Sequence, residues 1–128
     1  IRVVITGTEQ DMVDANMLIN SLKNTKIINA CGKTSINELA VLIKKCDVFI
    51  SADSSPLHIA SAVGTPFIAL FGPTDERRHL HPGKNYIVIN KNLDCAPCYK
   101  TKCRTKRCML EITPENVLAA LKKLLSLH

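Results

Sequence analysis

Short apolar runs alternate along this chain with stretches in which apolar residues recur every three or four positions. The runs predict β-strands, and the periodic stretches predict helices that bury one face. We expect strands at residues 1–7, 26–31, 47–52, 66–71 and 86–89, and helices over 8–24, from 35, over 55–63 and from 113. Apolar strands that alternate with helices are typical of a parallel sheet with helices on both faces. The pattern therefore predicts an α/β, Rossmann-like fold.

Polar residues mark the starts of several expected helices. Ser35 and Glu38 have the spacing of a capping box, and Thr113 with Pro114 begins the last helix. In that last helix, we expect the buried face to consist of Val117, Leu121, Leu124 and Leu125.

The most informative segment joins the strand at 47–52 to the helix at 55–63, and it reads Asp53-Ser54-Ser55-Pro56-Leu57-His58-Ile59-Ala60. Serines before a helix and proline in its first turn are typical of a helix start. The unpaired N–H groups there favour a phosphate, and parallel sheets bind ligands beyond the carboxyl ends of their strands. Loops at residue 7 and at 72–74 also follow strands, so we expect three loops to converge on one crevice. The segment predicts a site for an anionic, hydroxyl-rich ligand.

Each residue of that segment also has a structural interpretation. Ser54 is expected to cap the helix as well as to contact the ligand. Asp53 is either an acceptor for sugar hydroxyls or a carboxylate that stabilises the helix start through the helix dipole. His58 lies one turn into the helix on the side of Ser54, and is either a phosphate donor or a structural histidine.

Composition places the chain among soluble globular proteins. Its 128 residues are 46% hydrophobic and 22% charged, which fits one domain over 1–128. No apolar run is long enough to span a bilayer, and no secretory signal is visible. The chain begins at Ile1, directly in an expected strand, so we expect a fragment of a larger protein. The net charge of +6 favours anionic partners.

A basic, cysteine-rich loop is expected at residues 91–110. Without a secretion signal a reducing compartment is favoured, and disulfides are not expected. Cys31 and Cys46 are interpreted as small core residues. The loop's thiols are either ligands of a structural zinc or a packed, reduced loop, and these thiols are Cys95, Cys98, Cys103 and Cys108. Its cations either face a phosphorylated lipid or form a solvated surface, and they include Lys100, Lys102, Arg104, Lys106 and Arg107.

Three motifs together resemble the carboxyl-terminal domain of the heptosyltransferase family, glycosyltransferase family nine. They are the segment at 53–60, then Ala62-Val63-Gly64-Thr65-Pro66, then Leu70-Phe71-Gly72-Pro73-Thr74-Asp75. A Cys-x-Pro-Cys segment and a later Cys-Met before an Ile-x-Pro-Glu helix are also typical of the family. The resemblance covers nearly the whole chain and implies the carboxyl-terminal half of a glycosyltransferase-B fold. Ser55 stands where the family usually has glycine, which implies a slightly wider approach of the backbone to the ligand.

The resemblance implies the donor-binding part of an inverting transferase that moves heptose from ADP-heptose to the lipopolysaccharide inner core. It implies donor contacts at Asp53, Ser54, Ser55, His58, Asp11, Thr34 and Thr74. Glu9 competes with Asp11 for the nucleoside contact, and Thr74 with Asp75 either closes over the donor or forms a turn. No catalytic residue is expected in this fragment, because the acceptor and general base belong to an amino-terminal domain. The fragment alone is therefore expected to be inactive.

The resemblance implies that transfer needs no cofactor. The one metal that the sequence suggests is a structural zinc at the loop cysteines. The implied enzyme is expected in the cytoplasm at the inner face of the bacterial inner membrane, with peripheral membrane association and no nucleic-acid partner. Two alternatives remain: a nucleotide-sugar epimerase of the same fold, and a zinc-ribbon-like nucleic-acid module on the cysteine loop. The scarcity of aromatic residues, with three Phe, two Tyr and no Trp, argues against base stacking.

Overall fold

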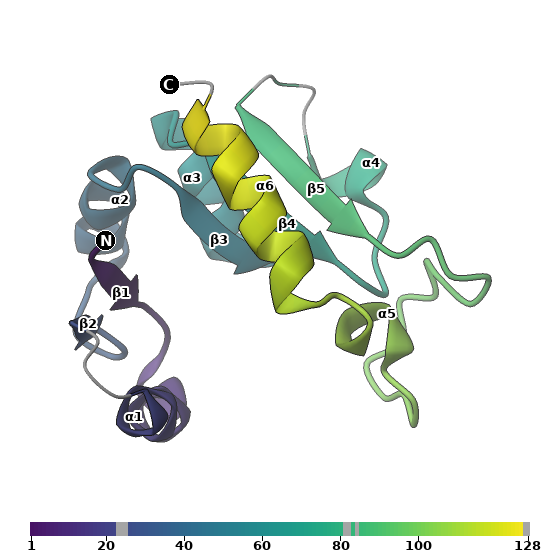
Figure 1. Ribbon diagram of the computed structural model, residues 1–128, viewed down its shortest axis with the longest axis horizontal. Coiled ribbons are helices and arrows are strands. Elements are labelled where there is room, and N and C mark those ends of the chain that lie inside the picture. The colour runs from purple at the N-terminus through teal and green to yellow at the C-terminus, as the bar shows by residue number, and fades with distance from the viewer. Residues whose placement is uncertain (23–25, 81–82, 84, 127–128) are drawn as a thin grey trace. The chain divides into compact units, whose positions relative to one another are not determined.

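The computed structural model describes residues 1–22, 26–80, 83 and 85–126. The chain forms two compact units, Ile1–Leu39 and Ala40–His128. The elements follow the alternation that the sequence predicts, with parallel strands separated by helices (Figure 1). None of the helices in the described ranges is long and apolar enough to cross a bilayer.

The first unit is a parallel strand pair with its crossover helix. Strand β1 (Val3–Ile5) pairs with β2 (Ile27–Asn29). Between them lie a 3-10 turn, η1 (Glu9–Asp11), and helix α1 (Met12–Ser21). The predicted helix over 8–24 thus begins in a tighter turn, and its expected last residue, Asn24, lies outside the described residues.

The second unit contains a parallel sheet in the order β3–β4–β5. Its strands are β3 (Phe49–Ala52), β4 (Phe67–Phe71) and β5 (Tyr86–Asn90). Its helices are α3 (Ser55–Val63), α4 (Glu76–His79), α5 (Arg107–Leu110) and α6 (Pro114–Ser126), while α2 (Ile36–Lys44) spans the boundary between the units. Figure 1 shows α6 in front of this sheet and α3 behind it, so helices cover both faces as predicted.

The core of the second unit lies between the sheet and α6. Ile68 of β4 packs with Ala120 and Leu124 of α6, and Val117 and Leu121 pack against this cluster. The prediction that Leu125 faces inward is wrong, because its side chain is 46% exposed. Ala120 and Leu124 are four residues apart and lie on the same inward stripe of the helix. Because successive residues of an α-helix are rotated by about 100°, Leu125 points away from the direction of Leu124.

The helix starts confirm most of the capping predictions. The Ser35 N–H donates to Glu38 Oε2 at 2.7 Å, and the Glu38 N–H donates to Ser35 Oγ at 3.2 Å, which is the expected capping box. At α6 the Asn116 N–H donates to Thr113 Oγ1 at 3.4 Å. Cys31 is completely buried, as predicted for a core thiol.

Candidate functional site

The segment between β3 and α3 places four predicted site residues together. Strand β3 ends at Ala52 and α3 begins at Ser55, so Asp53 and Ser54 lie at the carboxyl edge of the sheet. Ser54 occupies the cap position, but its hydroxyl makes no hydrogen bond to the helix. Ser54 Oγ instead lies 2.9 Å from Ser51 Oγ and donates to the Ala52 carbonyl at 3.2 Å. The predicted side-chain cap is therefore wrong, because this hydroxyl turns back toward the strand end.

This geometry leaves polar groups at the start of α3 available to a ligand. Among the described residues, nothing accepts from the N–H groups of Ser54 and Ser55, and Pro56 has no N–H to satisfy. The side chains of Ser55 and His58 are exposed, and the described part of the chain offers them no hydrogen-bond partner. The amino end of a helix carries partial positive charge, so these donors favour a negatively charged ligand.

Asp53 is the most enclosed of these side chains. Only 14% of its side-chain surface is exposed, and its Oδ2 lies 3.5 Å from His79 Nδ1 at the end of α4. No other group in the described ranges makes a polar contact with this carboxylate. His79 was not among the residues predicted from the sequence.

Helix α4 begins directly after the Gly72-Pro73-Thr74 turn. The Asp75 side chain caps it by accepting the Arg77 N–H at 3.0 Å. The Arg77 guanidinium also donates to both carboxylate oxygens of Asp75, from Nε to Oδ1 at 3.0 Å and from Nη2 to Oδ2 at 3.1 Å. These bonds lower the pKa of the Asp75 carboxyl. These contacts support the structural interpretation of Asp75, and its closing over a donor stays a prediction.

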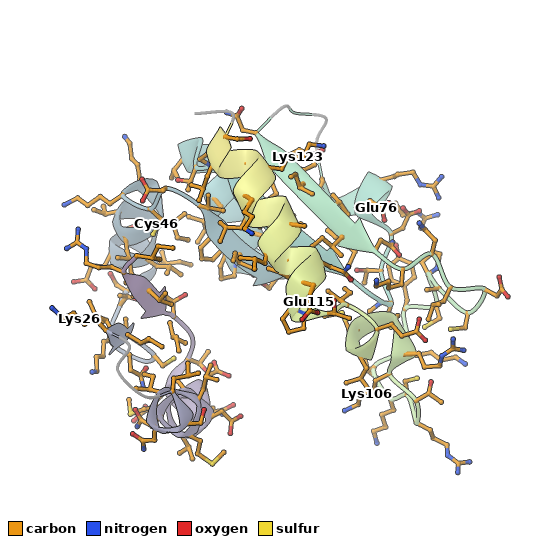
Figure 2. All side chains as sticks on the ribbon, viewed as in Figure 1. Lys26, Cys46, Glu76, Lys106, Glu115 and Lys123 are labelled. Atoms are coloured by element: carbon orange, nitrogen blue, oxygen red, sulfur yellow. The ribbon has the colours of Figure 1, made fainter. Side chains whose placement is uncertain are left out.

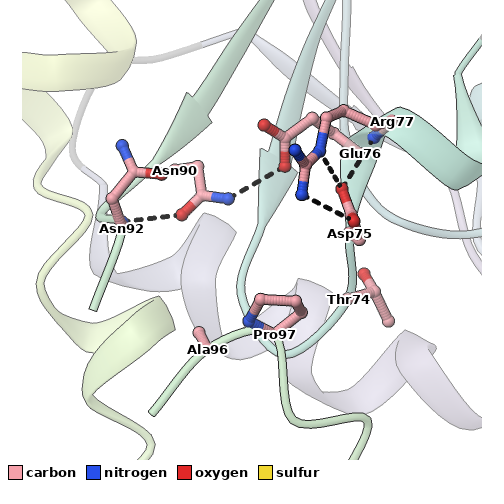
Figure 3. Close-up of a pocket in the computed structure, with 8 residues that line it drawn as sticks. All are labelled: Thr74, Asp75, Glu76, Arg77, Asn90, Asn92, Ala96 and Pro97. Carbon is pink, nitrogen blue, oxygen red and sulfur yellow. Dashed lines mark hydrogen bonds and ion pairs between the residues drawn. The ribbon is translucent and has the colours of Figure 1, made fainter. Parts of the chain in front are cut away.

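A pocket of about 340 Å³ opens beside α4, past the ends of β4 and β5. Figure 3 shows its polar walls: the Asn90 amide donates to Glu76 Oε2 at 3.0 Å, and the Asn92 N–H donates to Asn90 Oδ1 at 2.8 Å. Thr74 also lines it, yet the Thr74 hydroxyl is buried and has no partner in the described part of the protein. The lining consists of Thr74, Asp75, Glu76, Arg77, Asn90, Asn92, Ala96 and Pro97.

The cysteine-rich loop braces the turn that precedes α4. The N–H groups of Cys98 and Tyr99 both donate to the Pro73 carbonyl, at 2.9 and 2.8 Å. The Tyr99 hydroxyl accepts the Asp75 N–H at 3.2 Å. A Cβ atom at Gly72 would lie 2.7 Å from Met109 Sδ, so glycine allows α5 to approach this turn. The loop therefore holds the strand-end turn in place.

The zinc prediction has no support in this geometry. All four loop cysteines are described, and all are free thiols. Across the described ranges, no three or more His, Cys, Asp or Glu side chains are grouped so that they could hold a metal ion. The contacts instead resemble the alternative of a packed, reduced loop, in which Cys98 and Cys108 are half-buried against the Gly72–Pro73 turn.

Five of the six cations of this loop are exposed, namely Lys100, Lys102, Arg104, Lys106 and Arg107, whereas Lys91 is half-buried and its Nζ donates to Asn116 Oδ1 at 2.6 Å. Arg107 Nε donates to Glu111 Oε1 at 2.7 Å, and Figure 2 shows Lys106 on the outer part of the loop. Cys103 lies among them, and its Sγ accepts the Lys106 N–H at 3.3 Å. That N–H, the nearby Thr105 and the positive charge of Lys100 lower the pKa of the Cys103 thiol.

Asp11 and Thr34 belong to the first unit. Asp11 Oδ2 accepts the Thr8 N–H and the Thr8 hydroxyl, both at 2.7 Å, and these bonds lower its pKa. This is the helix-start role that an acid has at this position. Thr34 is half-buried directly before the Ser35–Glu38 capping box. The convergence of this unit's loops with the Asp53 segment stays a prediction.

The model of glycosyltransferase family 9 (heptosyltransferase) matches residues 1–109 of the 128-residue chain. The chain belongs to this family. It is 34% identical to lipooligosaccharide heptosyltransferase 2 of Campylobacter jejuni over 91% of this chain and 38% of that protein. It is 35% identical to lipopolysaccharide heptosyltransferase 3 of Escherichia coli K12 over 97% of this chain and 37% of that protein. The chain thus spans well under half the length of these curated relatives.

Solved structures confirm the predicted fold class. The chain superposes on E. coli ADP-heptose lipopolysaccharide heptosyltransferase II with a TM-score of 0.78 and 27% identity, covering 97% of this chain and 36% of that one. A glycosyltransferase family 9 protein from Veillonella parvula gives a TM-score of 0.77 at 23% identity, covering 99% and 37%. These neighbours are glycosyltransferase-B proteins, so the resemblance drawn from the sequence motifs is also confirmed.

Sequence reasoning missed His79, which lies beside the Asp53 carboxylate, and Tyr99, whose ring lies beside that of His79. Asp75, a favoured N-cap residue, was a usable signal for α4. No local signal indicated that a histidine at the end of so short a helix would reach Asp53. The ring of His79 lies 6.2 Å from that of Tyr99 and 6.4 Å from that of Phe71, and these contacts depend on the tertiary fold.

Proposed function

We propose that this chain supplies the donor site of an inverting glycosyltransferase that moves heptose from ADP-heptose to the inner core of lipopolysaccharide. The observation that carries the proposal is the start of α3, where unpaired donors lie beside an enclosed carboxylate. Membership of the heptosyltransferase family and a solved neighbour titled an ADP-heptose heptosyltransferase support this choice of donor. The same findings favour transfer over the epimerase and nucleic-acid alternatives.

The proposed chemistry uses the charge that develops on the leaving group. An acceptor hydroxyl attacks the anomeric carbon of the heptose and gives its proton to a general base. The bond from that carbon to the phosphate oxygen breaks, and ADP leaves with the bonding electrons. Inversion follows from attack on the face opposite the leaving group. We assign stabilisation of the departing diphosphate to the N–H groups of Ser54 and Ser55, the Ser55 hydroxyl and His58, because they lie at the start of α3 without partners among the described residues. Fixed donors of this kind stabilise the transition state more than the ground state, because the diphosphate gains negative charge as the bond breaks.

Asp53 has a different role in this scheme. Its negative charge disfavours a diphosphate, and it is suited to accept hydrogen bonds from sugar hydroxyls. We assign Thr74 to the donor because it lines the adjoining pocket, and its buried hydroxyl lacks a partner among the described residues. Asp11 and Thr34 are assigned to the nucleoside on the family resemblance alone.

The acceptor and the place of action form part of the same proposal. The acceptor is the lipopolysaccharide core, held by the portion of the enzyme that this chain does not include. The enzyme works in the cytoplasm at the inner face of the inner membrane. The exposed cations at 100–107 suit peripheral contact with that anionic surface or with the phosphorylated core.

Substitution of Asp53 in the full-length protein tests the donor site. Asp53→Asn should lower kcat/KM for ADP-heptose by roughly 10- to 100-fold, since a hydrogen bond to a charged group contributes about 1.5–3 kcal/mol. Asp47→Asn is the matched control, because Asp47 is exposed and precedes β3 at the opposite end of the same strand. Wild-type turnover by Asp53→Asn would remove Asp53 from the site, and failure of the wild type to bind ADP-heptose would reject the proposed function.

A further inference from the structure

We infer that His79 is a positioning residue that holds the Asp53 carboxylate for the sugar of the donor. This inference rests on the proposed function. Its basis is the 3.5 Å separation between His79 Nδ1 and Asp53 Oδ2, which joins the end of α4 to the strand end of β3.

The enclosure of Asp53 creates the need for such a residue. With 14% of its side chain exposed, the carboxylate has lost most of its water. Removal of water from a carboxylate is costly unless a donor compensates. In the described part of the chain, His79 is the one polar partner of Asp53, and its Nδ1 contacts Oδ2 only. Oδ1 is therefore left to accept from a ligand hydroxyl.

The His79 ring is itself held in place. It lies near the rings of Phe71, at a centroid distance of 6.4 Å, and of Tyr99, at 6.2 Å. Phe71 is completely buried at the end of β4. Tyr99 is tied to the strand-end turn, because its N–H donates to Pro73 and its hydroxyl accepts from Asp75. The neighbouring rings therefore restrict the His79 side chain, as a residue that positions Asp53 requires.

The same contacts connect the cysteine-rich loop to the donor site. Tyr99 comes from that loop, His79 from α4 and Asp53 from the β3–α3 segment. The cysteine-rich loop would then affect donor binding through Tyr99 and His79.

The test compares variants of His79 in the full-length protein, with the dissociation constant for ADP-heptose and kcat as readouts. His79→Leu removes the ring nitrogen that faces Asp53 Oδ2, and we expect ADP-heptose to bind about tenfold more weakly. His79→Asn keeps an N–H near the position of Nδ1, and we expect it to restore most of that loss. Arg78→Leu is the matched control on the same helix, because Arg78 is exposed, and its binding should equal that of the wild type.

A double-substitution cycle separates positioning from general damage to the fold. If His79 acts through Asp53, then His79→Leu should weaken binding no further in an Asp53→Ala background. Additive losses, or equal losses for His79→Asn and His79→Leu, would overturn the inference.

A readout without donor distinguishes failure of this inference from failure of the proposed function. The ¹⁵N chemical shift of His79 Nδ1 should change on Asp53→Ala and stay unchanged on Asp47→Asn. If the wild type binds no ADP-heptose while this shift changes, the proposed function fails and the His79–Asp53 contact is supported. If the shift does not change, the inference is overturned whatever the donor binding.

Discussion

Substitution of Gly72 measures how tightly the cysteine-rich loop packs on the strand-end turn. A Cβ built at Gly72 would lie 2.7 Å from Met109 Sδ, 2.9 Å from Met109 Cγ and 3.1 Å from Cys108 Sγ. Gly72 is not among the glycines with positive φ, so the expected cost of Gly72→Ala comes from this contact and not from backbone strain. Overpacking of a core costs about 1–3 kcal/mol of stability. Because the Met109 side chain is flexible, we expect Gly72→Ala to cost about 1–2 kcal/mol.

Urea denaturation of the wild type, Gly72→Ala, Met109→Ala and the double variant measures this cost. Because Met109 supplies the two closest atoms, Gly72→Ala should be at most weakly destabilising in the Met109→Ala background. Gly64→Ala is a contrasting control: no atom lies within 4 Å of its Cβ position, but its φ of +77° penalises a side chain. Its cost should therefore be independent of Met109. Equal costs of Gly72→Ala with and without the Met109 side chain would refute the proposed packing.

Two further predictions concern the core and the loop thiols. Leu124→Ala should lower the free energy of unfolding by about 2–5 kcal/mol, because Leu124 is 1% exposed, whereas Leu125→Ala at 46% exposure should cost far less; similar midpoints in urea would contradict the α6 packing. Cys103 should react fastest with iodoacetamide near pH 7, because its pKa is lowered, whereas Cys46 should react slowly, because burial and the charge of Asp47 raise its pKa. Peptide mass spectrometry of timed samples measures both rates, and faster labelling of Cys46 would contradict this order.

The sequence predicted best where local chemistry and the fold agree. Helix α3 has the predicted bounds, because Pro56 suits its first turn and Gly64, with a φ of +77°, ends it. The strand at 66–71 was found because its residues are apolar throughout, as expected for a strand between two neighbours and beneath helices on both faces. The family was predicted from motif order, which a single motif would not have supported.

The sequence predicted less where an element depends on distant contacts. Helix α4 contains Glu76-Arg77-Arg78-His79 and has no apolar periodicity, so only its Asp75 cap was visible in advance. Ser54 is a local miss: it had the correct position, but its hydroxyl contacts Ser51 Oγ and the Ala52 carbonyl, three and two residues earlier, instead of the helix. Both misses affect the candidate site, where side chains are arranged by the tertiary structure as well as by their own segment.

Two family motifs that looked independent in the sequence both contact the Gly72–Pro73 turn in the fold. The Cys-x-Pro-Cys segment ends where Cys98 and Tyr99 donate to Pro73, and the Cys-Met pair lies where Gly72 leaves room for it. The half-buried Cys98 and Cys108 fit this packing, since free cysteine behaves as a small hydrophobe. Because Tyr99 extends this packing to Asp75 and to the His79 ring, the same contacts that stabilise the turn also set the surroundings of Asp53. Stability of the loop and geometry of the proposed donor site should consequently change together when Gly72 or Tyr99 is substituted.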